Sequence, residues 1–335
     1  MTYKLCIETV FSNTSPEYWQ LLASQSNAHY FQGSSWSSAI SNNYSGCDTV
    51  WITAFKNDVP VGGLVLVSVT RAIFMQLYSN YEGTFGGPFC LPTLSGEEKL
   101  KVNSMLLEEF VKLTSGKKVI ASTVCTSSSE ADSILTRAGF EMRYSTGASI
   151  SLVDGYNHVE MNIIKKNRRN ERNRSLKRGC TTGVTTDPKI IDEYYPIYLR
   201  ATSRWGSKPA PEQLLKDLLA DSSGNAFMSW VRLDGKLIGG HLNFSAGGIV
   251  TAWNGATDLE LKDVFPASVL IFTDVEEACS RGCALLDLGA HGGVDGVEQF
   301  KRMFGAESDR RIMFVKKTVI KRMYDKLKSV TVGGA

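Results

Sequence analysis

The residues with the clearest chemical potential lie in the stretch 285–305. It begins as a buried strand and opens into a glycine-rich turn, and glycines let a backbone come close to a ligand. A short amphipathic segment follows, in which Lys301 stands between Phe300 and Phe304. A lysine held against apolar neighbours can stabilise negative charge that develops on a carbonyl or phosphate oxygen. An equally good interpretation is that Phe300 and Phe304 form an i, i+4 core pair and Lys301 is their solvated neighbour.

Such chemistry on an amine also needs a proton acceptor, and three residues are candidates. His241 follows the glycine pair 239–240, Asp287 ends the buried strand, and His291 lies in the glycine turn. Each has a structural alternative. His241 could be a strand histidine whose ring is hydrogen-bonded, Asp287 could cap the turn, and His291 could be a loop residue without a role. The sequence leaves the choice open.

The segment 165–178 concentrates positive charge. It holds eight Lys and Arg against a single Glu, a local net charge of +7, so the rest of the chain carries −4 of the total +3. Arg168, Arg169 and Arg172 are therefore candidates for binding an anion: tRNA, a nucleotide-sugar phosphate or an anionic membrane surface. The alternative is a linker helix with a solvated basic face. The segment lacks the interleaved aromatics typical of single-strand binders.

Length and composition favour a soluble protein of two domains, which we place at residues 1–155 and 156–335. The seven scattered cysteines favour a reducing compartment, and the four histidines show no metal spacing, so we expect no metal site. No signal peptide opens the sequence and no apolar run reaches about 18 residues. We therefore expect a cytoplasmic protein without a transmembrane segment.

The elements that position these residues occur twice. A predicted hairpin at 51–66 contains Gly62-Gly63, and a second at 229–243 contains Gly239-Gly240, 177 residues later. Each is followed by a strand, a long helix, another strand and a turn that pairs glycine with phenylalanine. This order predicts a duplication. The predicted fold class is α+β, with each copy a mostly antiparallel mixed sheet flanked by helices. A basic helix at 319–327 closes the chain.

Four motifs carry a resemblance to a known family. They are the basic segment KNRRNER at 166–172 with LKRG at 176–179, the hairpin LIGGHL at 237–242, the strand end WNGA at 253–256, and FKRMFG at 300–305. In this order and spacing they resemble tandem GNAT-fold proteins of the FemAB-like acyltransferase class. The first domain matches by layout more than by motif, and we interpret it as a degenerate copy that completes a cleft.

The resemblance implies transfer of an acyl or aminoacyl group to an amine. It implies that Lys301 lies at the reaction centre, that Trp253 shapes the acceptor site, and that Arg204 or Lys208 contacts an acceptor phosphate. We add two aromatic candidates for substrate binding, Phe304 of the closing motif and Tyr81. Tyr81 belongs to a loop, 78–88, that could line an acceptor cleft or be a turn pinned by aromatic packing.

The donor stays open between acyl-CoA and aminoacyl-tRNA, with no tightly bound cofactor. In relatives that bind CoA, glycines at a helix start hold the pyrophosphate, but the equivalent segment here, 261–267, reads LKDVFPA. The coiled-coil arm of many tRNA-dependent relatives is also missing. Expected partners are a small-molecule or nucleotide-sugar-linked acceptor, such as an amino-sugar, polysaccharide or cell-wall precursor, with tRNA and peripheral membrane contact as further possibilities. The alternative function is a non-catalytic GNAT-like protein that holds an anionic ligand.

Overall fold

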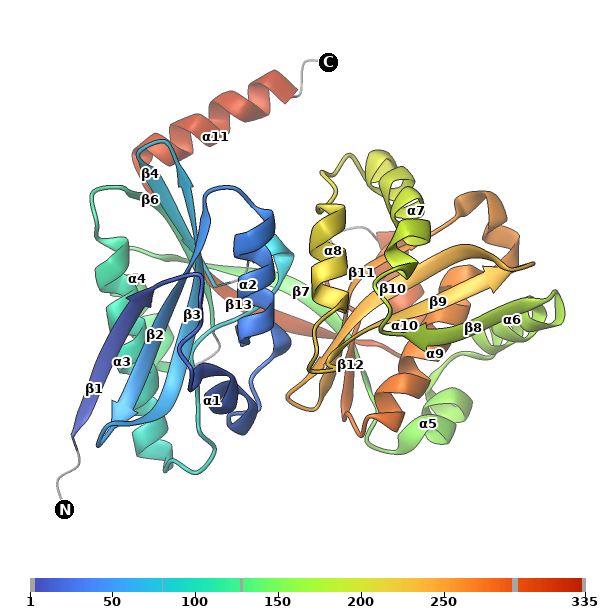
Figure 1. Cartoon of the computed structure of the whole chain (residues 1–335), viewed down its shortest axis with the longest axis horizontal. Coiled ribbons are helices and arrows are strands. Elements are labelled where there is room, and N and C mark those ends of the chain that lie inside the picture. Colours follow the sequence, from blue (N-terminus) through green and yellow to red (C-terminus); the bar gives the residue numbers. More distant parts are fainter. Residues whose placement is uncertain (1–3, 80, 127–128, 291–294, 333–335) are drawn as a thin grey trace. The chain divides into compact units, whose positions relative to one another are not determined.

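A computed structural model describes residues 4–79, 81–126, 129–290 and 295–332 (Figure 1). The chain divides into two compact units. Unit 1 comprises residues 1–145 together with 311–335, and unit 2 comprises residues 146–310. The segment 311–335, which we expected in the second domain, therefore belongs to the first.

Unit 1 is a mixed sheet with helices on both faces. Its strands follow the order β1-β2-β3-β4-β6-β13, and all neighbours are antiparallel except the parallel pair β4 and β6. Its principal elements are β1 (Leu5–Phe11), α1 (Trp19–Gln25), α2 (Ser34–Asn43), β2 (Cys47–Lys56), β3 (Val59–Arg71), β4 (Phe74–Tyr78), β5 (Phe89–Cys90), α3 (Gly96–Thr114), β6 (Val119–Cys125), α4 (Ser129–Arg137) and α11 (Val319–Val332). The long helix α3 begins at a capping box, in which Ser95 and Glu98 satisfy each other's backbone N–H groups.

Unit 2 repeats this plan. Its strands follow the order β7-β12-β11-β10-β9-β8, again antiparallel except for one parallel pair, β11 and β12. Its elements are α5 (Gly155–His158), a π-helical turn (Val159–Ile163), α6 (Lys166–Lys177), β8 (Cys180–Thr185), α7 (Ile190–Trp205), α8 (Glu212–Leu219), β9 (Ala226–Leu233), β10 (Lys236–Ala246), β11 (Ile249–Thr257), α9 (Pro266–Ser280), β12 (Leu285–Asp287) and α10 (Asp295–Met303). The duplication is thus confirmed at the level of the fold.

Two strands cross the boundary between the units. β7 (Glu141–Ser151) begins in unit 1 and ends in unit 2, where it pairs with β12. β13 (Glu307–Lys317) runs from unit 2 into unit 1, where it pairs with β6. The sheet of unit 1 is therefore completed by a strand that follows unit 2 in the sequence, whereas the paired part of β7 lies at the start of unit 2's own segment.

The repeated glycine pairs have a steric cause. A Cβ on Gly62 would lie 2.6 Å from Val102 of α3, and one on Gly63 would lie 2.7 Å from Trp19 of α1. In unit 2, Gly239 faces α9 and Gly240 faces α7 in the same manner. Successive strand residues point to opposite faces. Two adjacent glycines therefore let both helical layers approach the middle of each sheet, and Figure 1 shows α1 and α3 on the two sides of β3.

Candidate active site

A β-bulge in β11 marks the middle of the unit 2 sheet. Leu242 pairs with Asn254 and Asn243 pairs with Ala252, so Trp253 is the extra residue on β11. Bulges re-aim side chains and are frequent beside active sites. The Trp253 ring lies 5.8 Å from that of Phe244, and Asn254 accepts a hydrogen bond of 2.7 Å from the Tyr194 hydroxyl of α7. Burial raises the pKa of Tyr194 well above its usual value, so this hydroxyl remains a donor.

The parallel strands β11 and β12 separate just before this bulge. Their last registered pair is Thr251 with Asp287, where β12 ends, whereas β11 continues to Thr257. In sheets with parallel strands, ligands bind outside the carboxyl ends of those strands. Asp287 is buried, and its carboxylate accepts a hydrogen bond of 2.8 Å from the backbone N–H of Gly289. Asp287 thus caps the glycine turn, as one of the two interpretations expected.

Lys301 of α10 reaches the same turn. Its side chain is only 8% exposed, and its Nζ donates to the carbonyl oxygens of Gly289 at 2.9 Å and Ala290 at 3.0 Å. Phe300 and Phe304 form the expected i, i+4 pair, with ring centroids 5.0 Å apart. The alternative in which Lys301 is solvated is therefore wrong, because the ammonium lies buried at the end of β12.

His241 lies on the opposite face of the sheet. Its ring packs over Gly255, and its Nδ1 lies 2.6 Å from the carboxylate of Asp274 of α9, which is fully buried. Leu286 packs in the core cluster beneath α9, so its neighbour Asp287 points to the other face. Of the three candidate bases, Asp287 therefore shares the α7 face with Trp253, His241 does not, and His291 lies outside the described residues.

Arg204 and Lys208 lie at the end of α7 and in the following loop, and both are exposed. One turn earlier, Arg200 pairs with Asp258 at 3.2 Å, which fixes the end of α7 beside the residue that follows β11. Between the two candidates, Trp205 is 57% exposed. No role was expected for this tryptophan, although its place between cations in the loop SRWGSKPAP was a usable signal.

The three arginines of α6 are bonded to protein groups. Arg168 pairs with Glu171 at 2.7 Å and lies over the Phe300 ring, and Arg169 donates to three backbone carbonyls. Arg172 pairs with Glu160 and donates to the Tyr156 hydroxyl, whose pKa burial raises to about 12. This placement favours packing over anion binding, which stays a prediction. Other cations of the segment are exposed, namely Lys165, Lys166, Arg174, Lys177 and Arg178.

The first turn of α9 is occupied by a carboxylate that the sequence analysis assigned no role. Glu171 of α6 accepts a hydrogen bond of 2.5 Å from Ser268, the third residue of α9. Ser175 donates to the carbonyl of Val264 just before the helix, and Arg178 donates to that of Asp263. Helix α6 therefore covers the start of α9, where the resemblance led us to look for a pyrophosphate site.

The two aromatic candidates have different surroundings. Phe304 is fully buried and packs against Phe272, which favours a core role over substrate contact. Tyr81 belongs to unit 1, where its hydroxyl accepts a hydrogen bond from the Cys47 thiol and its ring contacts Tyr44 and Tyr78. Burial raises the pKa of Tyr81. Within unit 1 the loop is pinned by aromatic packing, and its contact with an acceptor stays a prediction.

Comparison with known proteins shows what unit 2 and the whole fold resemble. Residues 163–302 match a family model described as an acetyltransferase (GNAT) domain. A search of curated sequences returned no match. Among solved structures, FemX is 15% identical, with 91% of this chain and 96% of that chain covered and a TM-score of 0.70.

Two further structures share the fold. The C-terminal domain of a putative lysylphosphatidylglycerol synthetase from Agrobacterium fabrum is 14% identical over 81% of this chain and 85% of that one, with a TM-score of 0.57. A tandem GNAT protein from the clavulanic acid biosynthesis pathway is 10% identical over 93% and 98%, with a TM-score of 0.53.

These findings show a GNAT domain match over residues 163–302 and a fold shared with FemX and a tandem GNAT protein. Residues 163–302, which contain Trp253, Asp287 and Lys301, are the part that matches the GNAT domain. The chain as a whole has the FemAB-like fold of two consecutive GNAT-like units.

Proposed function

We propose that unit 2 transfers an acyl group to an amine at the carboxyl end of the β11–β12 pair. The observation that carries this proposal is the buried ammonium of Lys301, held by two carbonyls beside Asp287. The amine attacks the carbonyl carbon of an acyl ester or thioester, a C–N bond forms, and the carbonyl oxygen becomes an oxyanion. The intermediate then collapses and expels the alcohol or thiol.

The residues at this site have separate roles. The positive charge of Lys301 stabilises the oxyanion, because it is fixed in a buried place and needs no reorganisation. Asp287 accepts the proton that the attacking amine loses and returns it to the leaving alcohol or thiol. Trp253 provides an aromatic wall for the acceptor, and Arg204 and Lys208 supply exposed cations for a phosphate on it.

We further propose that the donor is an aminoacyl ester on tRNA rather than acyl-CoA. The carboxylate of Glu171 at the first turn of α9 repels the pyrophosphate that this helix start would otherwise attract. The corresponding helix of unit 1, α3, carries Glu97 and Glu98 in its first turn. The exposed cations of α6 suit the phosphates of an RNA. FemX and the lysylphosphatidylglycerol synthetase domain, which share the fold, are consistent with an acceptor in the cell envelope.

Substitution of Lys301 tests the catalytic proposal. Lys301→Ala should lower kcat/KM for aminoacyl transfer by about 10²- to 10³-fold, the usual loss for one oxyanion donor. Donor affinity should stay unchanged. Lys301→Arg keeps the positive charge and should retain part of the activity. This variant distinguishes the effect of the charge on catalysis from the effect of losing the two hydrogen bonds to Gly289 and Ala290. Lys236→Ala removes an exposed lysine at the start of β10 and serves as the matched control. Full turnover by a folded Lys301→Ala enzyme would contradict the assignment.

A thermal-shift comparison tests the donor separately. A ligand at a hundred times its Kd stabilises a protein by about 2.7 kcal/mol. Charged tRNA should raise Tm, and acetyl-CoA or longer acyl-CoAs should not. A shift with an acyl-CoA alone would reverse the donor assignment and leave the role of Lys301 to the kinetic test.

A reducing, cytoplasmic setting remains part of the proposal. All seven cysteines are described, and none forms a disulfide. Within the described ranges, no helix combines the length and the apolar character needed to cross a membrane.

A further inference from the structure

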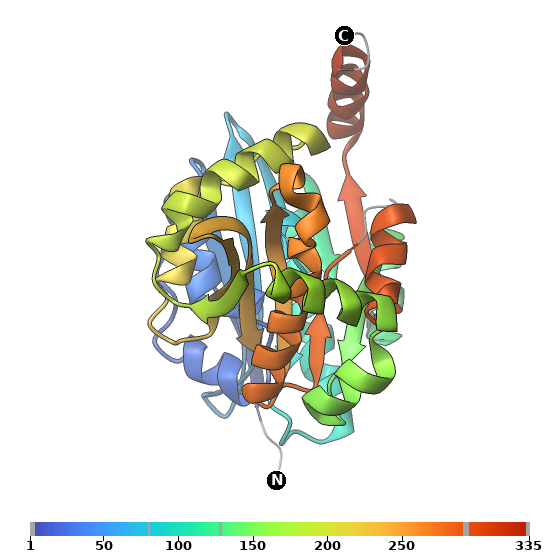
Figure 2. The same cartoon turned by 90° about the vertical axis from the view of Figure 1, so that its right-hand side faces the viewer.

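Helix α11 turns its apolar side toward solvent. Its large apolar side chains are between 57% and 72% exposed, namely Val319, Ile320, Met323, Tyr324 and Leu327. The last four have the i, i+3, i+4, i+7 spacing that places side chains on one face of a helix. We call this set of five residues the apolar stripe. Figure 2 shows α11 extending away from the end of β13.

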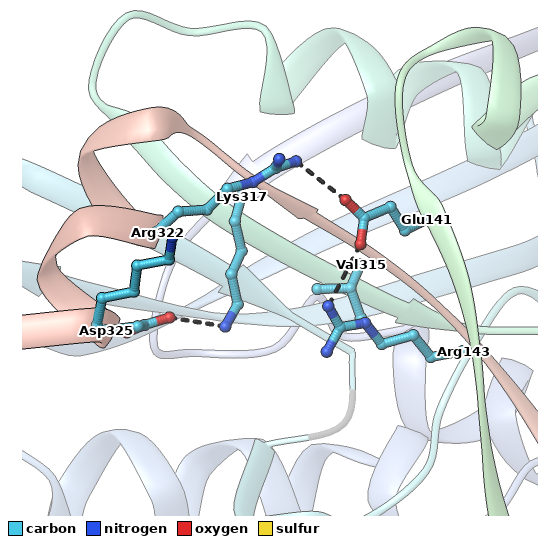
Figure 3. Close-up of a pocket in the computed structure, with 7 residues that line it drawn as sticks. Glu141, Arg143, Val315, Lys317, Arg322 and Asp325 are labelled. Atoms are coloured by element: carbon cyan, nitrogen blue, oxygen red, sulfur yellow. Dashed lines mark hydrogen bonds and ion pairs between the residues drawn. The ribbon is translucent and has the colours of Figure 1, made fainter. Parts of the chain in front are cut away.

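The charged side of the same helix attaches it to unit 1. Arg322 pairs with Glu141 of β7 at 3.0 Å, and Asp325 pairs with Lys317 of β13 at 2.7 Å. Lys321 adds an intrahelical pair with Asp325. Figure 3 shows Arg322 and Asp325 directed toward the strand residues. A surface helix ordinarily packs its apolar face on the protein and leaves its charged side chains in water. Helix α11 has the opposite orientation, because its charged side contacts the protein and its apolar side faces solvent.

The surface beside the stripe is positive. A cavity of about 320 Å³ lies where α11 meets β7 and β13, and Val315 and six charged residues line it (Figure 3). The charged residues are four cations, Arg143, Lys317, Arg322 and Lys326, and two carboxylates, Glu141 and Asp325. Lys321 is a further cation on the helix. This excess of positive charge opposes the approach of a second copy of the same surface and complements an anionic one.

We propose that α11 docks unit 1 on an anionic lipid surface. The apolar stripe enters the interface between headgroups and acyl chains, and the surrounding cations meet the anionic headgroups. Since α11 has 14 residues, it lies along the surface and does not span the bilayer. The inference uses only unit 1 residues and does not depend on the chemistry proposed for unit 2.

Vesicle co-sedimentation of the full chain tests the proposal. The protein should bind vesicles of phosphatidylcholine with about one third phosphatidylglycerol, should bind pure phosphatidylcholine vesicles far less, and should dissociate as salt is raised. The triple variant Ile320→Ser, Met323→Ser, Leu327→Ser should weaken binding about tenfold or more, because three apolar side chains no longer leave water. Its Tm should stay unchanged, since these side chains are already exposed.

The control removes apolar side chains of similar exposure elsewhere. Ile73→Ser, Val153→Ser and Met161→Ser together alter exposed positions outside α11 and should leave vesicle binding intact. Equal binding by the α11 variant and the wild type would overturn the proposal, as would no binding of the wild type to anionic vesicles. If light scattering shows a dimer that the α11 variant converts to a monomer, a second copy covers the stripe and the lipid assignment is wrong.

Discussion

At the scale of single residues, the carboxylate of Glu171 lies at the start of α9. Its carboxylate bonds both Arg168 of its own helix and Ser268 of α9. A negative group at a helix N-terminus is stabilising, but it also excludes a second anion from the same place. In the function we propose, this one side chain is what keeps pyrophosphate away from the start of α9.

Removal of this carboxylate should make the helix start attract anions. In Glu171→Ala, Arg168 loses its ion-pair partner and Ser268 loses its acceptor, so the site becomes positive. We expect measurable binding of acetyl-CoA by calorimetry where the wild type has none, together with a loss of about 1–3 kcal/mol in the free energy of unfolding. Glu276→Ala removes the same charge from an exposed position on α9 and should change neither quantity. An unchanged CoA affinity in Glu171→Ala would show that the carboxylate does not block the site.

At the scale of elements, the paired glycines set the distance between sheet and helices. The Cβ of an alanine at position 62 would lie 2.6 Å from Val102 and 2.9 Å from the carbonyl oxygen of Phe89. The backbone contact cannot be relieved by rotating a side chain, so β3 and β5 must move apart.

Gly62→Ala should therefore lower the free energy of unfolding by about 1–3 kcal/mol, the usual cost of overpacking. The measurement is chemical denaturation at equilibrium. Gly96→Ala is the control, because a Cβ at this first residue of α3 meets nothing within 4 Å, and it should be neutral or stabilise by about 0.4–1 kcal/mol. Equal stability of the two variants would mean that the strands shift at little cost.

The sequence predicted the positions of helices and strands better than the contacts that their side chains and backbones make. Residue patterns located the glycine-pair hairpins and placed Lys301 beside a core aromatic pair. They did not predict that the arginines of α6 bond to Glu160 and to backbone carbonyls. The sequence of a positive segment is the same whether its side chains donate hydrogen bonds to water or to protein groups. Nor did they predict the bulge at Trp253, which depends on the register between two strands.

At the scale of the whole molecule, unit 1 depends on β13, which follows unit 2 in the sequence. The residues of β6 from Ala121 to Cys125 pair with Lys317 to Met313 of β13. Periodicity could not reveal this pairing, since a strand pattern does not say which sheet edge the strand joins. Without β13, this side of β6 would be an unpaired edge.

Truncation after Arg310 should therefore open unit 1 at β6. Hydrogen exchange of the amides at 121–125 should become much faster, while β10 in unit 2 keeps its protection. Truncation after Thr318 removes α11 but retains β13, and it should leave β6 protected. Equal protection in both truncated proteins would show that β13 contributes little to the stability of unit 1.

The crossing strands also determine the order in which the units can be completed during synthesis. Unit 2 receives its edge strand β7 before any of its other strands has been translated. Unit 1 is translated first, yet its sheet lacks β13 until residues 311–317 emerge from the ribosome, after all of unit 2 has been translated. Until then, the edge of β6 in unit 1 is unpaired. The unit that begins to fold first is therefore the one that is exposed to aggregation for the longest time.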